Sequence, residues 1–233
     1  MLDAILFDLD GTLLPMETKE FVEGYFSILA KKAAPLGFEA KGLYGMLWRG
    51  VEVMVKNDGH ETNEAAFWRA FAETYGAARP EDMAMFNDFY SHEFDGAKRF
   101  TQPNPHAREA VRLAREKAGR VILATNPVFP PCAVRTRLSW VGLSPEDFDF
   151  VTTFDNSGFC EPNPDYYRAI LSRFSLDAGR CMMIGNDIGE DMVPTKEVGL
   201  SQFLVTDCVI RRGLPFDGPQ GSFSDLLAHL KSL

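Results

Sequence analysis

Two aspartates separated by one residue follow a short apolar run near the start of the chain. The run covers residues 4–7 and is followed by Asp8, Leu9, Asp10 and Gly11. An uncharged run that ends in acids and a glycine is typical of a buried parallel strand, whose carboxyl end lies where α/β sheets keep their ligands. We therefore expect a ligand site here, at which one carboxylate attacks or binds a metal while the other moves a proton.

A second apolar run, residues 121–124, ends in Thr125 and Asn126. The Thr125 hydroxyl and the backbone N–H of Asn126 can each donate a hydrogen bond to a phosphoryl oxygen. Pro127 has no N–H, so backbone donation stops at Asn126. A strand that ends in Thr-Asn is by itself more often a cap or a turn.

A third apolar run, residues 181–184, leads to Asp187 and, four residues later, to Asp191. A helix that begins near Asp187 would place both acids on one face, near Asp8 if the two strands are neighbours. Carboxylate oxygens suit magnesium, which binds one or two carboxylates and keeps several waters. Helix capping is an equally good interpretation of Asp191 and the preferred one of Glu190.

The stretch 7–13, Phe-Asp-Leu-Asp-Gly-Thr-Leu, resembles the first motif of the haloacid dehalogenase-like hydrolases, a superfamily made mostly of magnesium-dependent phosphatases. The other two strand ends match that family's second and fourth motifs, and this resemblance implies that Thr125 and Asn126 bind the phosphate. The resemblance implies that Asp8 forms an aspartyl-phosphate, while Asp10 protonates the leaving alcohol and then activates water. It also implies Mg²⁺ held by Asp8, the Asp10 backbone carbonyl and Asp187, with Asp191 as a further ligand or beside the ligands.

The third motif departs from the family. Residues 160–167 keep its Pro-x-Pro-x-x-Tyr framework, but Glu161 stands where the family has a lysine. That lysine would neutralise the nucleophile and the transferring phosphate, and loss of one such donor typically costs about 100- to 1,000-fold in rate. A carboxylate in its place further opposes a phosphate dianion.

Three interpretations of Glu161 remain open. Another cation, for example Arg135 or Lys196, takes the place of the lysine; the site works slowly with magnesium and Thr125; or turnover is lost. A weakened phosphatase is preferred because the other motif positions are intact. The alternative is a non-catalytic binder of magnesium and a phosphorylated ligand. A phosphomutase also fits these residues, whereas a dehalogenase needs no proton donor equivalent to Asp10.

The elements that must position these residues alternate between strand and helix in the second half of the chain. This alternation predicts an α/β fold with a doubly wound, Rossmann-like parallel sheet. The further predicted strands are residues 121–124, 150–153, 181–184 and 202–205, and the predicted helices are 104–117, 131–140, 164–174 and 223–231.

Residues 16 to about 99 break this alternation, because their pattern is helical throughout. We interpret them as a helical cap inserted after the first strand, as in the family, which divides the chain into a core of residues 1–14 and 102–233 and a cap of residues 15–101. The cap's aromatic residues could line a substrate pocket, but a small helical bundle needs them for its own core, and that interpretation is preferred. They are Phe21, Tyr25, Phe26, Trp48, Phe67, Trp68, Phe86 and Phe89.

Composition narrows the class of protein. The 233 residues are 45% hydrophobic and carry a formal net charge of −9, which suits one or two globular domains and disfavours a nucleic-acid partner. The expected partner is instead a small phosphorylated substrate with Mg²⁺ as cofactor. Neither a membrane span nor a signal peptide is expected near the start, so the predicted location is cytoplasmic. The oligomeric state does not follow from the sequence.

The remaining polar residues carry no clear chemistry. The four cysteines form no C-x-x-C pair, which argues against a zinc or redox site. The four histidines lack the spacing of metal ligands. The pair Arg211-Arg212 is interpreted as part of a solvated loop.

Overall fold

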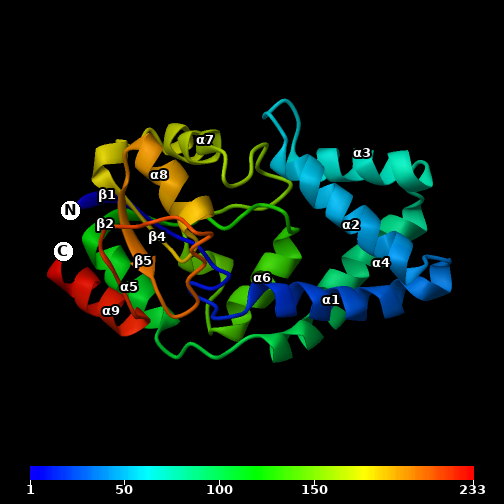
Figure 1. The fold of residues 1–233 in the computed structure, drawn as a ribbon, viewed down its shortest axis with the longest axis horizontal. Helices are drawn as coiled ribbons and strands as arrows, with labels where there is room; N and C mark the ends of the chain where they lie inside the picture. The colour runs from blue at the N-terminus through cyan, green and yellow to red at the C-terminus, as the bar shows by residue number, and fades with distance from the viewer.

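The computed structural model covers residues 1–233 and contains one sheet of six parallel strands in the order β3-β2-β1-β4-β5-β6 (Figure 1). The strands are β1 (Leu2–Phe7), β2 (Ala118–Leu123), β3 (Phe150–Val151), β4 (Cys181–Gly185), β5 (Ser201–Val205) and β6 (Gln220–Gly221). The predicted doubly wound α/β fold is confirmed. The sequence prediction missed β6, whose two residues are too few to form a hydrophobic pattern.

The sheet is covered on both faces, as its uniformly apolar strands require. Alternate residues of β1 point to opposite faces, so Ile5 and Phe7 belong to one buried cluster and Ala4 and Leu6 to another. Helices α5 (Ala107–Lys117), α6 (Pro131–Trp140) and α9 (Phe223–Ser232) pack on the first face, while α7 (Pro164–Phe174) and α8 (Val193–Val198) pack on the second.

Helix boundaries follow local signals where such signals exist. Helices α6 and α7 begin at Pro131 and Pro164, as predicted, because proline at the first helical position loses no hydrogen bond. Helix α5 begins three residues later than predicted, at Ala107. Asn104 does not cap this helix. Its side chain instead donates to the Leu13 carbonyl at 3.0 Å and accepts from the His106 N–H at 3.1 Å.

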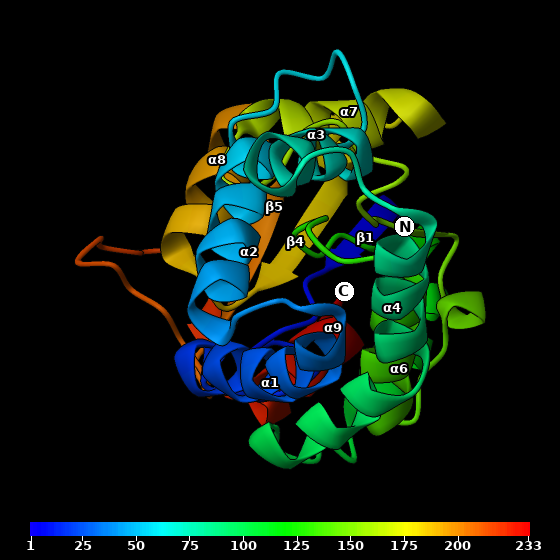
Figure 2. The same cartoon turned by 90° about the vertical axis from the view of Figure 1, so that its right-hand side faces the viewer.

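The segment between β1 and β2 is helical, as predicted. It contains α1 (Thr18–Ala33), α2 (Ala40–Val55), α3 (Asn63–Tyr75) and α4 (Pro80–Ser91), together with short 3₁₀ turns at Ala34–Leu36 and Glu93–Phe100. Figure 2 shows these four helices in front of strands β1, β4 and β5. The proposed domain boundaries at residues 14/15 and 101/102 stay a prediction. None of the helices is both long and apolar enough to cross a membrane.

One buried asparagine ties the helical segment to the sheet domain. Asn63, which is fully buried, donates to the Pro127 carbonyl at 3.1 Å and accepts from the Asn57 side chain at 2.9 Å. Helix α3 begins here because the Thr62 hydroxyl accepts from the Ala65 N–H at 3.2 Å. The contact fixes the start of α3 against the loop after β2. It thereby positions the helical segment beside the carboxyl ends of the central strands.

Candidate functional site

The ends of three adjacent strands bring the predicted residues together. Strand β1 pairs with β2 and β4, so Asp8, Thr125 and Asp187, which follow these strands, lie at one edge of the sheet. The Asp8 N–H donates to the Ile184 carbonyl at 2.9 Å, which continues the β1–β4 pairing up to the first acid. The predicted convergence of these motifs at one edge is therefore confirmed.

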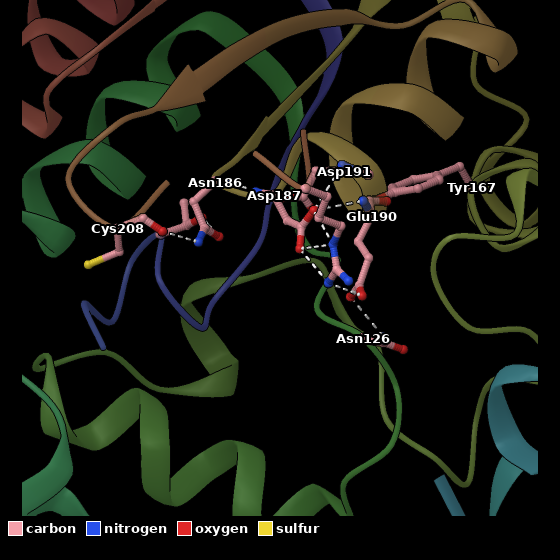
Figure 3. Close-up of polar contacts among 10 residues, drawn as sticks. Asn126, Tyr167, Asn186, Asp187, Glu190, Asp191 and Cys208 are labelled. Carbon is pink, nitrogen blue, oxygen red and sulfur yellow. Dashed lines mark hydrogen bonds and ion pairs between the residues drawn. The ribbon is translucent and has the colours of Figure 1, made fainter. Parts of the chain in front are cut away.

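The turn after Asp8 is locked against the loop after β4. Gly11 has a φ of +91°, and a Cβ there would lie 2.2 Å from the Asn186 side chain, so only glycine fits. The Thr12 hydroxyl donates to Asn186 Oδ1 at 3.0 Å, and the Asn186 amide donates to the Cys208 carbonyl at 2.8 Å (Figure 3). Asn186, which the sequence prediction gave no role, thus holds two loops of the site together.

All the residues predicted for the site line one cavity of about 430 Å³ between the sheet edge and the cap helices. They are Asp8, Asp10, Thr125, Asn126, Glu161, Asp187 and Asp191, and Glu190 joins them. The lining contains no lysine and one arginine, Arg212. The cavity therefore holds a large excess of acidic over basic groups.

This excess changes the acidity of the buried carboxyl groups. Burial, followed by the charges of Asp191 and Asp10, raises the pKa of Asp8 well above its usual range. Burial also raises the pKa of Asp191 to about 7. Six carboxyl groups line the cavity, and a cation beside Asp8 and Asp191 would favour their ionised forms.

Asp10 differs from Asp8 because it has a cationic partner. Its Oδ2 pairs with Nη1 of Arg137, a side chain on α6 that is 1% exposed and lies 4.2 Å over the Phe129 ring. Burial raises the pKa of Asp10, and Arg137 opposes this shift. Asp10 Oδ1 is buried without a hydrogen-bond partner, so this oxygen is available to give or take a proton. The sequence prediction missed Arg137. Its position on the same helix face as the apolar residues Ala133 and Val134 indicates that it is buried, and this was the available signal.

Arg211 and Arg212 are both exposed, as predicted, but Arg212 also contacts acids of the site. The Arg212 guanidinium contacts Asp187 Oδ2 at 2.7 Å and Glu190 Oε1 at 2.5 Å. The loop is held there because the Ile210 N–H donates to the Asn186 carbonyl at 2.9 Å. The sequence offered one signal for this role of Arg212. It is a basic residue in the loop after β5, which lies at the edge of the sheet that carries the acids.

Glu161 lies inside the site and is 3% exposed. Its Oε1 accepts from the Tyr167 hydroxyl at 2.6 Å. Burial, then the charges of Asp191 and Asp8, raise the pKa of Glu161 well above its usual range. The Glu161 carboxyl group therefore lies among other carboxyl groups, with a single neutral hydrogen-bond donor beside it.

Neither cation suggested from the sequence takes the place of the lysine. Arg135 pairs with Glu146 at 2.8 Å, and Lys196 lies 3.9 Å from Asp217, both among exposed side chains. Neither residue lines the cavity. These two suggestions are wrong because α6 and α8 turn these side chains to solvent.

Thr125 is held by its backbone. Its N–H donates to the Thr152 hydroxyl at 3.1 Å, and its carbonyl accepts from the Tyr166 hydroxyl at 3.0 Å. Neither contact uses the Thr125 hydroxyl, which remains for a ligand in the cavity. The neighbouring Asn126 places its amide 3.5 Å from Glu190, and its Oδ1 is buried without a partner.

The acids after β4 were expected on a regular helix, but a π-helical turn, Ile188–Met192, follows Asp187 and leads into α8. Asp191 Oδ2 accepts from the Asn186 and Asp187 N–H groups at 2.9 and 2.8 Å, so one of its oxygens caps this turn. Asp187 caps it as well, through the Gly189 N–H at 2.8 Å.

The donor set fits magnesium better than a softer metal. No three acidic, histidine or cysteine side chains converge as a complete metal-binding group. Magnesium does not need one, because it binds one or two carboxylates and completes its shell with water and substrate oxygens. Burial, then the charges of Asp191 and Asp10, raise the pKa of Asp8, and a divalent cation would relieve this charge imbalance.

A comparison of the whole chain with known proteins finds a matching family. Residues 2–199 match the family described as haloacid dehalogenase-like hydrolase. A ribulose-1,5-bisphosphate 5-phosphatase from Halopiger xanaduensis is 24% identical over 210 residues, which cover 88% of this chain and 84% of that protein.

Solved structures share the fold along the whole chain. A 2-haloacid dehalogenase from Pseudomonas syringae pv. Tomato is 18% identical with a TM-score of 0.65, and the match covers 100% of this chain and 99% of that one. CbbY from Rhodobacter sphaeroides, solved with phosphate, is 21% identical with a TM-score of 0.60, and the match covers 99% of this chain and 100% of that one.

The unlike surroundings of Asp8 and Asp10 predict opposite effects of the same substitution on stability. Asp8→Asn removes a buried charge that other acids repel, so the free energy of unfolding of the metal-free protein should rise. Asp10→Asn leaves Arg137 buried without a counter-ion and should lower it by about 3 kcal/mol. Urea unfolding in a chelator measures both values, and equal effects of the two substitutions would contradict the assigned pairing.

The raised pKa of Asp191 predicts a pH dependence of stability. Well below its usual pKa of 3.8 this group is protonated in the folded and unfolded chain alike. Its folded pKa of about 7 exceeds that value, so its ionisation destabilises the folded chain as pH rises between the two. Asp191→Asn should therefore be more stable than the parent chain by about 4 kcal/mol at pH 8 and show little difference at pH 4. A pH-independent gap in urea unfolding without metal would refute this assignment.

Proposed function

The chain belongs to the haloacid dehalogenase-like hydrolase family, and on this premise we propose that it is a magnesium-dependent phosphomonoester hydrolase acting on a small phosphorylated metabolite. The observation that carries the proposal is the unequal pair of acids at the end of β1. Asp8 has no cationic partner and faces the cavity, whereas Asp10 is held by Arg137 and keeps one oxygen free. One acid is thus suited to attack and the other to proton transfer.

In the proposed reaction Asp8 attacks phosphorus in line with the ester oxygen. The phosphorus–oxygen bond to the alcohol breaks, an aspartyl-phosphate forms, and Asp10 Oδ1 gives its proton to the leaving alcohol. Asp10 then takes a proton from a water that attacks this phosphate, which restores Asp8 and releases inorganic phosphate. The Thr125 hydroxyl and the Asn126 N–H donate to the phosphoryl oxygens.

The residues that would hold magnesium are Asp8, the Asp10 backbone carbonyl and Asp187, with Asp191 beside them. When bound, the ion neutralises charge on the phosphoryl oxygens and on the surrounding carboxylates. Asp187 also engages Arg212, so the metal and the guanidinium would share this carboxylate.

We assign to Arg212 the role that the family gives to the missing lysine. It is the one cation that lines the cavity, and its contacts with Asp187 and Glu190 hold it at the edge where the transferring phosphate would lie. Its side chain is 48% exposed, so it approaches from the solvent side and does not replace the buried charge next to Glu161. We therefore propose that the phosphatase is active but weaker than one with a lysine at residue 161.

Phosphate release from 4-nitrophenyl phosphate tests the assignment of Arg212. Release should require magnesium and should be abolished by Asp8→Asn. Arg212→Gln should lower kcat/KM about 100-fold, because it removes the only cation in the cavity lining. Arg211→Gln is the matched control, since Arg211 is the exposed neighbour outside the cavity, and it should change kcat/KM less than about twofold. Equal effects of the two arginine substitutions would rule out this role of Arg212.

Glu161→Lys tests whether residue 161 limits the rate. It should raise kcat/KM about 100-fold, because it adds the missing donor and removes an opposing charge. In the double variant Glu161→Lys/Arg212→Gln, loss of Arg212 should cost far less than in the parent chain, since the introduced lysine would then supply the cation. An inactive parent chain together with an active Glu161→Lys variant would instead favour the non-catalytic binder of magnesium and a phosphorylated ligand.

A further inference from the structure

The cavity has two ends of different chemistry. The end at the sheet edge carries all six carboxyl groups and Arg212. The other end is formed by helices α1 and α2 and by the loop residues Val128 and Phe129. A substrate whose phosphate lies beside Asp8 would place its alcohol part against this second end.

Two helix faces make that second end apolar. Helix α1 contributes Phe21, Val22, Tyr25 and Phe26, and α2 contributes Trp48, Val51 and Val55, which recur at three and four residues on one face. The preferred interpretation of these aromatics as cap core is correct for Phe67, Phe86 and Phe89, which lie outside the cavity. It is incomplete for Phe21, Tyr25, Phe26 and Trp48, which line it.

Two aromatic side chains of α2 at the edge of the cavity are exposed. Tyr44 and Trp48 are 44% and 45% exposed. Their rings lie 6.1 Å apart, and the Phe26 ring lies 5.2 Å from Tyr44 and 6.1 Å from Trp48. Trp48 and Phe26 also line the cavity, so the exposed Trp48 ring extends its apolar lining toward solvent.

The cap side of the cavity offers almost no polar partners. It contains no lysine, arginine or histidine, and its polar groups are the Thr18 and Tyr25 hydroxyls and the Trp48 indole. A second phosphate or a carboxylate placed there would have no counter-ion. Sugar hydroxyls would lose their water without regaining most of their hydrogen bonds. This end of the cavity thus selects against both kinds of ligand.

We propose that the preferred substrate is a phosphomonoester of an apolar, ring-sized alcohol, and that sugar phosphates and bisphosphates are poor substrates. This inference rests on the proposed phosphatase function. It sets the chain apart from the relative named for ribulose-1,5-bisphosphate, because no cation in this cavity can receive a second phosphate. The alcohol part packs against Phe26, Trp48 and Val51 while its phosphate lies beside Asp8.

A matched pair of substrates tests the preference. Cyclohexylmethyl phosphate and glucose 6-phosphate are both esters of a primary alcohol on a six-membered ring, but only the sugar carries ring hydroxyls. With magnesium, kcat/KM should be at least about tenfold higher for the cyclohexyl ester, since pockets of this kind discriminate by about 10- to 200-fold. Fructose 1,6-bisphosphate should be a poorer substrate than either.

A pair of variants on α2 tests the location. Val51 lines the cavity, whereas Val53 on the same helix does not, and both are half-buried. Val51→Arg should lower kcat/KM for cyclohexylmethyl phosphate at least about tenfold and raise it for fructose 1,6-bisphosphate. Val53→Arg should leave the ratio of the two values unchanged within about twofold. Thermal unfolding confirms that both variants are folded.

The possible failures are distinguishable. Faster turnover of glucose 6-phosphate or of the bisphosphate by the parent chain would overturn the apolar preference and leave the phosphatase function intact. If no ester releases phosphate, the proposed function is wrong, and calorimetry then decides the preference. Cyclohexylmethyl phosphonate should bind at least about tenfold more tightly than glucose 6-phosphate, and equal or weaker binding would overturn the inference.

Discussion

Crowding of carboxyl groups at the ends of three parallel strands is the constraint on which this site depends. Parallel pairing of β1 with β2 and β4 brings the motifs to one edge, and this edge is buried beneath the cap helices. Burial withdraws the water that would screen the charges, so the pKa values of Asp8 and Asp191 rise. The same repulsion that disfavours the metal-free folded chain would favour binding of a divalent cation. Stability and proposed function are therefore opposed at Asp8.

Two arginines form ion pairs with these carboxyl groups, and they do so in different ways. Arg137 is buried on α6 and engages Asp10 alone, which separates the surroundings of the two acids in the first motif. Arg212 lies on the loop after β5 and contacts Asp187 and Glu190 from the solvent side. Neither guanidinium lies where the family's lysine would stand, and Glu161 there accepts only from the Tyr167 hydroxyl. This distribution is the physical basis for a proposed phosphatase that is active without that lysine.

The apolar half of the cavity complements the acidic half. In the proposed reaction the carboxylates, Arg212 and a bound cation would recognise the phosphate but would not discriminate between the alcohols attached to it. Discrimination falls to α1 and α2, whose inward faces offer aromatic rings and valines and no charge. Helix α3, whose start is held by Asn63, packs against α2 and so helps to fix the position of this helix beside the cavity. The part of the chain that would bind phosphate and the part that would select the alcohol are thus separate in sequence and adjacent in space.

The sequence by itself determined five of the six strands, the helix starts at Pro131 and Pro164, the order of the motifs and the convergence of Asp8, Thr125 and Asp187 at one edge. These features depend on local patterns and on the rule that parallel strands end at the same side of a sheet. Only the tertiary structure decided that Arg212 enters the site, that Arg137 holds Asp10, and that Trp48 lines the cavity while Phe86 is core. These outcomes depend on packing between residues far apart in the chain: 127 positions separate Arg137 from Asp10. A helical pattern states that a face is apolar, but not whether that face meets another helix or an open cavity.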